Sequence, residues 1–383
     1  MESLAIVGGI SLTTDLFCAI LLSILLSITG KSNPPLLMIK KNRVTNKEVA
    51  RVAGVSTQTV SRVINNRPDV SPETRQKVQE VIQQLGYRPS AVARSLIQQR
   101  SYTLGVITAG LKFIGPSMIL NGITGEAEEL GYALLLKELP RFDTHDVEHI
   151  FQSLIDRHAD GIIWAVPEVG ENQRWLRQLS PNLSVPVIFL TSPPHSDLHY
   201  IDYDNYQGGR MATQHLLDQG FRKIGHISGP LEWLSARQRK EGWQDTLRDA
   251  GIEAKSSCTV EGNWSQGSGE RAFRQLLEQY PEMDAVFVAN DQMASVILQI
   301  ACREAIKVPQ ELGVVGFDGL MESAYYWPPL TTVFQDFHLL GCTAVKELVE
   351  IIEAKLSGTP NKVSTQVLLQ PKLVIRESSV KRG

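Results

Sequence analysis

The sequence predicts an α/β protein in two parts, a small N-terminal all-α domain and a larger core of two α/β lobes. Residues 44–85 contain three short stretches with apolar side chains at helical spacing. From residue 102 onward, apolar runs of strand length alternate with helix-like stretches. Charge divides the chain at the same place: residues 40–100 hold twelve Lys or Arg and four acidic residues, a net of +8, whereas the whole chain is −3 and the remainder therefore −11.

The first two helices are expected within residues 44–66. Thr45 with Glu48 three residues later predicts a capping box, and Gly54 predicts a left-handed residue that ends the first helix. Ser56 is expected to cap the second helix. The outer face of that helix is then polar: Thr57, Gln58, Ser61 and Arg62. Side chains of these kinds reach base edges and phosphates in the major groove of DNA, so the pattern indicates a DNA-binding domain rather than a simple helical hairpin.

A third helix is expected to complete this small domain. Ser71 is the expected cap, Pro72 occupies the first helical position, and Gly86 ends the helix. The net positive charge of the segment fits a module that binds nucleic acid, joined to an acidic body that does not.

The core is expected to contain two successive lobes. In the first half, strands are predicted at 103–108, 133–137, 161–166, 185–190 and 199–203, with helices at 117–130, 144–157 and 171–179. In the second half, the prediction is a helix from 205 to about 219, strands at 223–228, 284–289 and 312–317, and helices at 235–250, 266–279 and 291–305. Two last strands flank Pro371. Such alternation predicts parallel sheets covered on both faces, with a ligand at the carboxyl ends of the strands, in the cleft between the lobes.

Polar residues at strand ends suggest what that ligand is. Asn290 follows one predicted strand, Asp318 ends another, and Gln335 ends the segment LTTVFQ. Arg237 lies at the head of a helix, and Trp264 lies in a loop after CTVEGN. Carboxylate, amide and guanidinium groups can pair with sugar hydroxyls, and an indole ring can cover the apolar face of a sugar. Asp291 is interpreted as a helix cap, and an ion pair between Arg237 and Asp318 is the structural alternative.

Two long segments carry a resemblance to a known family. VTNKEVARVAGVSTQTVSRVIN and VSPETRQKVQEVIQQLGYRPSAVARSL resemble the headpiece and hinge of the lactose-repressor (LacI/GalR) family of bacterial transcription regulators. The similarity continues through VFVANDQMA, ELGVVGFDG and PPLTTVFQDFHLLG, and covers about residues 40 to 376. It implies a helix-turn-helix headpiece at 38–89, a hinge helix or linker at 90–100, a two-lobed periplasmic-binding-protein-like core for effector binding and dimerisation at 101–376, and a tail at 377–383.

The resemblance also implies which residues bind DNA. They are Thr45, Ser56, Thr57, Gln58, Thr59, Ser61, Arg62, Asn65, Ser71, Tyr87, Ala93 and Leu96. In the family the hinge folds only on DNA, and the residue matching Leu96 wedges into the minor groove; packing of Leu96 on the core is the alternative. Two headpieces are expected on a near-palindromic operator, with half-sites about one helical turn apart.

The effector pocket is implied in the same way. Its expected residues are Ala109, Phe113, Thr191, Arg237, Trp264, Asn290, Asp318 and Gln335. Thr191 stands where the member that gives the family its name has an aspartate, and Ala109 where it has a serine. The particular sugar is therefore open, although a β-galactoside or another small sugar is expected. A purine or another corepressor is the alternative ligand.

The first 37 residues form an apolar extension that contains LFCAILLSILLSI. Either translation starts at Met38, or the segment anchors the protein in a membrane with the headpiece on the cytoplasmic side. The expected protein is a cytoplasmic, nucleoid-associated repressor of sugar-utilisation genes, and a membrane-tethered regulator is the alternative.

Other features narrow the expected class and assembly. No enzyme motif of the G-x-S-x-G, H-E-x-x-H or P-loop type occurs, and the four cysteines lack metal-ligand spacing, so no catalysis, cofactor or metal is expected. An exported sugar receptor would share the core but would have no use for the headpiece. No leucine heptad follows the core, which predicts a homodimer rather than a tetramer.

Overall fold

The computed structural model describes residues 44–64, 67–87, 100–142, 147–167, 169–170, 184–191, 198–358 and 366–381. The chain divides into two compact units, one up to Ser90 and one from Ala91. Among the described residues, no helix combines the length and hydrophobicity that crossing a bilayer requires. The predictions for residues 1–37, for the helix at 171–179, and for Asn65, Ala93 and Leu96 fall outside the described residues.

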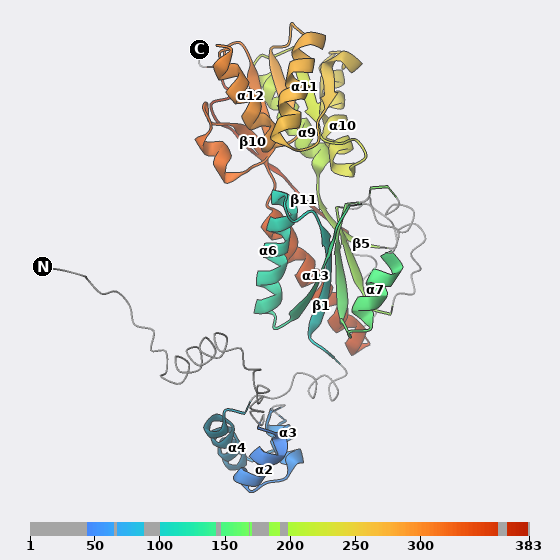
Figure 1. The fold of residues 1–383 in the computed structure, drawn as a ribbon, viewed down its shortest axis with the longest axis vertical. Helices are drawn as coiled ribbons and strands as arrows, with labels where there is room; N and C mark the ends of the chain where they lie inside the picture. The colour runs from blue at the N-terminus through green and yellow to red at the C-terminus, as the bar shows by residue number, and fades with distance from the viewer. Residues whose placement is uncertain are drawn as a thin grey trace, which may run out of the picture. The chain divides into compact units, whose positions relative to one another are not determined.

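The N-terminal unit contains the three predicted helices, α2 (Asn46–Ala53), α3 (Thr57–Ile64) and α4 (Pro72–Leu85) (Figure 1). They pack through small apolar side chains, among them Val49, Val60 and Val78, which are fully buried. Gly54 adopts a left-handed φ of 66° and ends α2 as predicted. The Ser56 hydroxyl accepts a hydrogen bond from the Thr59 amide at 3.0 Å, and that of Ser71 accepts one from the Thr74 amide at 3.3 Å.

The predicted capping box of α2 is wrong. Thr45 occupies the N-cap position, but its side chain makes no capping hydrogen bond. The amides of Glu48 and Val49 instead donate to the backbone carbonyl of Thr45, at 3.0 and 3.1 Å. The Glu48 amide, which a capping box would direct to the threonine hydroxyl, is therefore already engaged by the backbone.

The first lobe of the core is a six-stranded parallel sheet in the order β11-β5-β4-β3-β1-β2. Its strands are β1 (Thr103–Ala109), β2 (Ala133–Leu139), β3 (Gly161–Ala165), β4 (Val187–Leu190), β5 (His199–Tyr203) and β11 (Gln366–Leu369). Helices α6 (Ile114–Glu129) and α13 (Phe337–Ser357) pack together on one face, and α7 (Val147–Ile155) covers the other (Figure 1).

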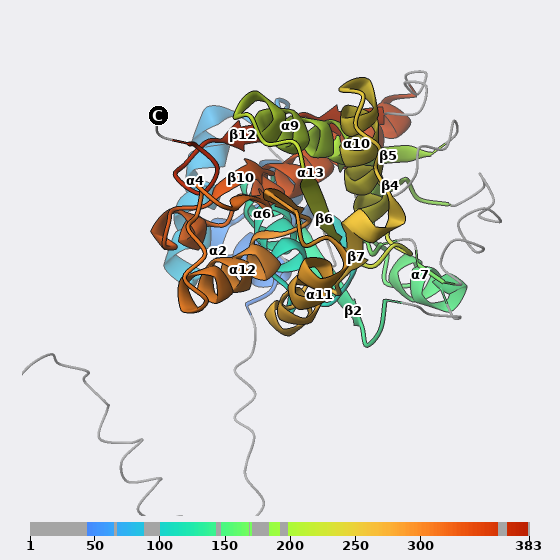
Figure 2. The same ribbon diagram turned by 90° about the horizontal axis from the view of Figure 1, so that it is seen from above.

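The second lobe repeats this plan with the order β12-β10-β9-β8-β6-β7. Its strands are β6 (Ile224–Ser228), β7 (Thr259–Glu261), β8 (Ala285–Val288), β9 (Gly313–Asp318), β10 (Thr331–Phe334) and β12 (Lys372–Val374), the last antiparallel to β10. Figure 2 shows α9 (Asn205–Asp218) and α10 (Leu234–Asp249) on the opposite side of the sheet from α11 (Gln266–Gln279) and α12 (Asp291–Arg303). Two short 3-10 helices, η1 (Ser256–Cys258) and η2 (Met321–Tyr325), complete the lobe.

The chain passes between the lobes three times: from β5 to α9, from β10 to α13, and from β11 to β12. The two strands around Pro371 therefore exist as predicted but belong to different sheets. The other predicted core elements lie within three residues of their predicted bounds wherever the structure describes them. Helix α13 was not among the predicted elements.

Two glycines set how closely α9 and α10 cross. A Cβ atom on Gly209 would lie 2.3 Å from the backbone oxygen of Arg239, and one on Gly242 would lie 2.3 Å from that of Tyr206. Only residues without a side chain allow this approach. The crossing fixes the part of α10 that carries Arg239 against α9.

Candidate functional site

A cavity lies between the two lobes of the core, where the strands of both sheets end. Six of the eight residues predicted for the pocket line it: Phe113, Thr191, Trp264, Asn290, Asp318 and Gln335. The first lobe supplies two of these side chains and the second lobe supplies four. The position agrees with the rule that ligands of open α/β sheets sit beyond the carboxyl ends of the strands.

Two predicted pocket residues do not line the cavity. The guanidinium of Arg237 donates to the backbone oxygens of Leu231 and Glu232, at 2.9 and 2.8 Å, and so holds the loop before α10. The pocket arginine is Arg239, which lies on another side of α10 because two residues turn an α-helix by about 200°. Ala109 is fully buried in the apolar cluster beneath α7.

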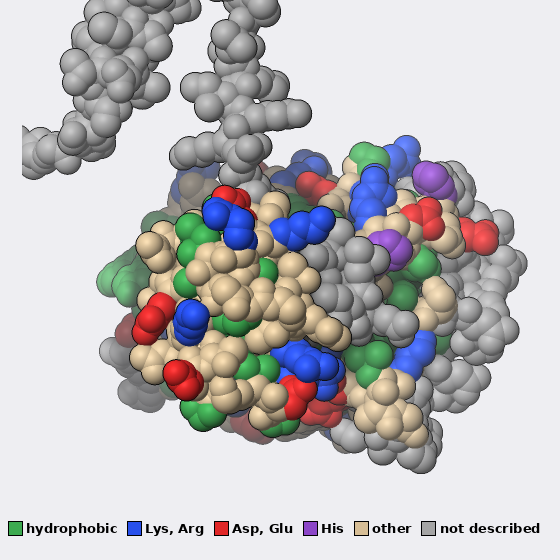
Figure 3. Space-filling view, turned by 90° about the horizontal axis from the view of Figure 1, so that it is seen from below, with side chains coloured by type: hydrophobic (Ala, Val, Ile, Leu, Met, Phe, Trp, Pro, Cys, Tyr) green, Lys and Arg blue, Asp and Glu red, His purple; other side chains and the backbone are tan. Residues whose placement is uncertain are grey.

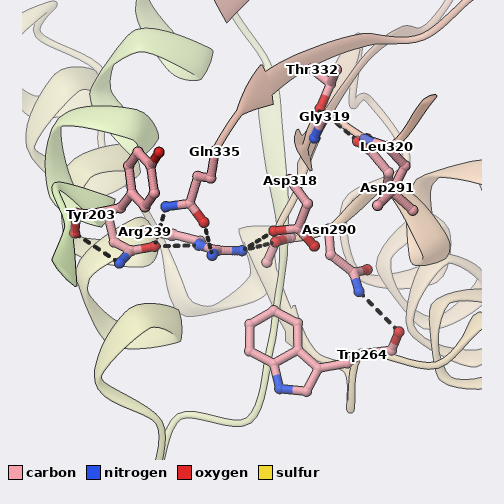
Figure 4. A network of polar contacts seen from close by, with 12 residues as sticks. Tyr203, Arg239, Trp264, Asn290, Asp291, Asp318, Gly319, Leu320, Thr332 and Gln335 are labelled. Atoms are coloured by element: carbon pink, nitrogen blue, oxygen red, sulfur yellow. Dashed lines mark hydrogen bonds and ion pairs between the residues drawn. The ribbon is translucent and has the colours of Figure 1, made fainter. Parts of the chain in front are cut away.

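Arg239 is the centre of a polar network (Figure 4). Its Nε donates to Asn205 Oδ1 at 2.9 Å and its Nη2 to Gln335 Oε1 at 3.1 Å. Its Nη1 donates to the Ala289 oxygen at 2.5 Å and to Asp318 Oδ1 at 3.3 Å. Four of the five N–H groups of the guanidinium are therefore satisfied within the protein. Since Arg239 is only 5% exposed, these partners offset the cost of burying its charge.

Aromatic rings flank the guanidinium. Its central carbon lies 3.8 Å from the ring centroid of Phe317 and 5.5 Å from that of Trp264. A cation over an aromatic face is attracted by the ring quadrupole. The stacking and the hydrogen bonds together hold Arg239 in one orientation, and one of its N–H groups has no acceptor among the described residues.

Two carboxyl groups line the cavity with Arg239. Burial raises the pKa of Asp318 to about 6, against the opposing effect of the Arg239 guanidinium. Burial also raises the pKa of Asp202, at the end of β5, to about 7. Asp318 has a φ of 98°, an unusual value for a residue with a side chain, and lies directly before Gly319.

Asn290 lines the cavity as predicted, but Asp291 does not have the capping role that was predicted for it. Asn290, rather than Asp291, is the N-cap residue of α12, and its Oδ1 accepts from the Met293 amide at 2.9 Å. The carboxylate of Asp291 accepts from the Leu320 amide at 2.8 Å and the Thr332 hydroxyl at 2.7 Å. Asp291 therefore holds the turn after β9 (Figure 4) and is not among the residues that line the cavity. Asn290 Nδ2 donates to the Trp264 carbonyl, so Asn290 also fixes the loop that carries Trp264.

A run of aromatic rings connects the two lobes beside the cavity. Phe113 and Phe142 of the first lobe have ring centroids 5.9 Å apart. Phe142 meets Trp233 of the second lobe edge-on at 4.9 Å, and Trp233 meets Trp264 edge-on at 5.8 Å. Phe113, Trp233 and Trp264 line the cavity. An aromatic wall of this kind can cover the apolar face of a ligand ring.

The cavity residues that were not predicted from the sequence include Asp202, Asn205, Trp233 and Arg239. For Asp202 a signal was present, because a carboxylate within the otherwise buried strand HYIDY requires a special reason. For Arg239 the signal was ambiguous, because Arg237 stands two residues away in the same helix.

The polar face of α3 is the candidate DNA-binding surface. Thr57, Gln58 and Arg62 are exposed, whereas Thr59 and Ser61 are half-buried. The hydroxyls of Ser56 and Thr59 share a hydrogen bond of 2.9 Å. Arg62 Nη1 lies 3.4 Å from Asp69 Oδ2, with both side chains about half exposed. Such a pair contributes little to stability and leaves Arg62 able to reach a phosphate or a base.

The other predicted DNA-binding residues are divided between structural and exposed positions. Ser71 caps α4, and Tyr87 packs against the apolar core of the N-terminal unit. Thr45 is exposed. The described part of this unit carries six Lys or Arg and four acidic residues, and Figure 3 shows positive and negative side chains interspersed on the face in view. Most of the net charge of +8 over residues 40–100 therefore comes from Lys40, Lys41, Arg43, Arg88 and Arg94, which lie outside the described residues.

Comparisons with known proteins cover both units. Residues 45–90 match the model of bacterial regulatory proteins of the lacI family, and residues 213–379 match the periplasmic binding protein-like domain. The HTH-type transcriptional repressor PurR of Haemophilus influenzae (strain PittEE) is 32% identical over 334 residues, which are 87% of this chain and 98% of that protein.

Solved structures give the same result. The lac repressor dimer bound to operator and the anti-inducer ONPF has a TM-score of 0.79 and 32% identity, covering 89% of this chain and all of that one. The complex of the transcriptional regulator CelR with cellobiose has a TM-score of 0.64 and 30% identity, covering 88% of this chain and all of that one.

Proposed function

The chain belongs to the lacI family of bacterial regulatory proteins, and we propose that it is a transcriptional repressor that a small sugar releases from its operator. The headpiece binds DNA, and the sugar binds in the cavity between the lobes of the core. The functional unit is a homodimer in the cytoplasm, where the operator is, and the protein is not an enzyme.

The observation that carries the DNA-binding role is the polar, exposed face of α3. Thr57, Gln58 and Arg62 project from a helix whose other face is buried against α2 and α4. A helix of this kind places its N-terminal side chains against base edges in the major groove. Ser71 caps α4, and Tyr87 packs against the apolar cluster that also buries one face of α3. The hinge residues Ala93 and Leu96 are proposed to contact the minor groove.

The DNA-binding role can be tested on an operator selected from random duplexes. Fluorescence anisotropy at fixed salt would compare that operator with a scrambled duplex, for the wild type and for Arg62→Ala. We expect the preference for the operator to fall about tenfold or more. Lys77→Ala, on α4, is the matched loss of one positive charge and should leave the preference unchanged. An unchanged preference in Arg62→Ala would exclude α3 as the recognition helix.

The sugar-binding role is supported by the composition of the cavity. Amide, carboxylate and guanidinium groups provide paired acceptors and donors on one side, and Phe113, Trp233 and Trp264 provide an aromatic wall. One relative of similar fold was solved with cellobiose. The aromatic wall is larger than predicted and makes a purine the second candidate ligand, because a purine would use the rings for stacking.

Arg239, which lines the cavity, and Arg237, which does not, offer a pair of variants for the binding test. Isothermal titration against lactose, cellobiose, ribose, glucose, galactose, adenine and guanine identifies the ligand. Arg239→Lys should then lose affinity by about tenfold or more, since lysine cannot reproduce the forked contacts. Arg237→Lys should bind like the wild type. Equal losses in both variants would contradict the placement of Arg239 in the pocket.

The two sites are proposed to communicate through the lobes. A ligand that favours one arrangement of the lobes over another changes the separation of the two hinges in the dimer. The two hinge helices then no longer contact each other on the operator, and the affinity for DNA falls. Ligand and DNA must weaken each other's binding by the same factor.

A further inference from the structure

Asp202 has an unusual position in the cavity. It is the last residue but one of β5, only 6% exposed, and it lines the space between the lobes. Within the described part of the chain, its carboxylate accepts one hydrogen bond, from the neighbouring Tyr203 amide at 2.7 Å. A buried carboxylate normally has several partners. Asp202 therefore has acceptor capacity left that faces the cavity.

The only cation among the described lining residues is already engaged. Three charged side chains line the cavity: Asp202, Arg239 and Asp318. Arg239 forms an ion pair with Asp318, and most of its N–H groups donate hydrogen bonds to protein oxygens. Arg239 favours the ionised form of Asp202, but no hydrogen bond joins the two within the described residues. The described lining carries one carboxylate more than it has cations.

Asp202 lies beside a position that was predicted to bind the effector. Strands β4 and β5 pair in parallel with Leu190 opposite Ile201, and the Thr191 amide donates to the Ile201 oxygen at 3.4 Å. Thr191 and Asp202 are therefore neighbours at the same edge of the sheet, and both line the cavity. The carboxyl group that the first lobe contributes to the cavity is therefore on β5, next to the threonine that follows β4.

We propose that Asp202 is a ligand-binding carboxylate of the first lobe, and that it makes the pocket select uncharged or amino sugars over acidic ones. A hydroxyl or ammonium group of the ligand donates to the free acceptor positions of Asp202. At a pH above the pKa of Asp202, a uronate or sugar phosphate would place a second negative charge beside this carboxylate, with no unpaired cation among the described lining residues to compensate. The inference rests on the proposed sugar-binding function.

The test is a titration of matched ligands that differ in charge at one position. Glucose, glucosamine, glucuronate and glucose 6-phosphate form one series, and galactose with its amine, uronate and 6-phosphate forms another; lactose and cellobiose are added as neutral disaccharides. Tryptophan fluorescence reports binding, because Trp233 and Trp264 line the cavity. The proteins are the wild type, Asp202→Asn, and Asp156→Asn as the control, an exposed aspartate of the same lobe.

We expect the wild type to bind neutral or amino members and to reject the acidic ones. Asp202→Asn should lose about tenfold or more in affinity for the neutral or amino sugar that the wild type binds. The ratio between that affinity and the affinity for the matching acidic sugar should become smaller. Asp156→Asn should match the wild type. An acidic member that binds as tightly as its neutral parent, or an unchanged affinity in Asp202→Asn, would overturn the role of Asp202. Binding of no sugar at all would contradict the proposed function itself, and the inference with it.

Discussion

Arg239 and Asp318 show how single residues define the pocket. The guanidinium is buried, stacked on Phe317, and tied to Asn205 and Gln335 as well as to Asp318. Such a network holds its members in one geometry, so a ligand meets fixed donors and acceptors. Because these side chains are already ordered in the folded protein, ligand binding does not carry the entropic cost of ordering them.

Replacing Asp318 by Asn should separate sugar binding from DNA binding. The variant keeps the shape of the side chain but loses the charge that pairs with Arg239, so we expect sugar affinity to fall by about 10- to 100-fold. Operator affinity without sugar should not change, because Asp318 belongs to the core. Anisotropy of labelled operator during a sugar titration measures both quantities. A release midpoint equal to that of the wild type would remove Asp318 from the ligand site.

Asp202 should make stability depend on pH. Its pKa is about 7 in the folded protein and 3.8 when unfolded, so between these values the folded state holds a proton that the unfolded state has lost. This group therefore lowers the free energy of unfolding as the pH rises from about 4 to about 7. Asp202→Asn removes the effect, and its melting temperature relative to the wild type should be higher at pH 8 than at pH 5. A difference that does not vary with pH would contradict the shifted pKa.

Many residues of the site could be predicted from the sequence, and the others were missed for physical reasons. Asp318 and Gln335 follow from one rule, because strand ends of a parallel sheet converge. Arg239 could not be predicted in this way, because the choice between Arg237 and Arg239 depends on the rotation of α10 about its axis. Asn205 and Trp233 were missed because their positions depend on packing between distant segments. For Asn65, Ala93 and Leu96 the predictions stay predictions.

At the level of elements, the crossing of α9 and α10 links fold to site. Gly209 lies against the backbone of Arg239, so the helix contact and the pocket guanidinium share one position. Gly208 and Gly209 both lie in the first turns of α9. The sequence did not show what the two glycines contact.

Gly209→Ala should therefore disturb both stability and binding. The added Cβ would lie 2.3 Å from the Arg239 oxygen, so the helices must move apart, which costs about 1 to 3 kcal/mol. Gly125→Ala on α6 is the matched control, because a Cβ there would contact nothing within 4 Å. Calorimetry should show a lower melting temperature for the first variant and no loss for the second, and the first should also bind sugar more weakly. Equal melting temperatures would show that the crossing tolerates a side chain.

The alternation of elements was predictable because buried parallel strands are short apolar runs between amphipathic helices. Helix α13 was missed although Leu340, Ala344 and Leu348 follow helical spacing, a signal that the sequence does contain. The assignment of β11 and β12 to different sheets could not be foreseen, since it depends on the paths of the chain between the lobes.

One exposed apolar segment of the core is a candidate interface for association with a second copy of the chain. Met321, Tyr325 and Trp327 lie in or beside η2, and each is more than 80% exposed. Large apolar side chains gathered at a surface are typical of protein interfaces. We expect this segment to contribute to the homodimer.

Trp327→Asp should weaken that dimer. Sedimentation over a range of concentrations should show more monomer than in the wild type, because the aspartate would place a charge in an apolar contact. Leu356→Asp, which changes an exposed leucine on α13, should leave the dimer intact. A dimer of unchanged strength in Trp327→Asp would place the interface elsewhere.

The proposed function requires that the pocket and the DNA-binding face be coupled. The direct measurement is a pair of affinities: that of the operator with and without saturating sugar, and that of the sugar with and without operator. We expect each ligand to weaken the binding of the other by the same factor, of roughly 5- to 150-fold. If the sugar binds and the operator binds, but neither affinity depends on the other ligand, the core is not the regulator of the headpiece.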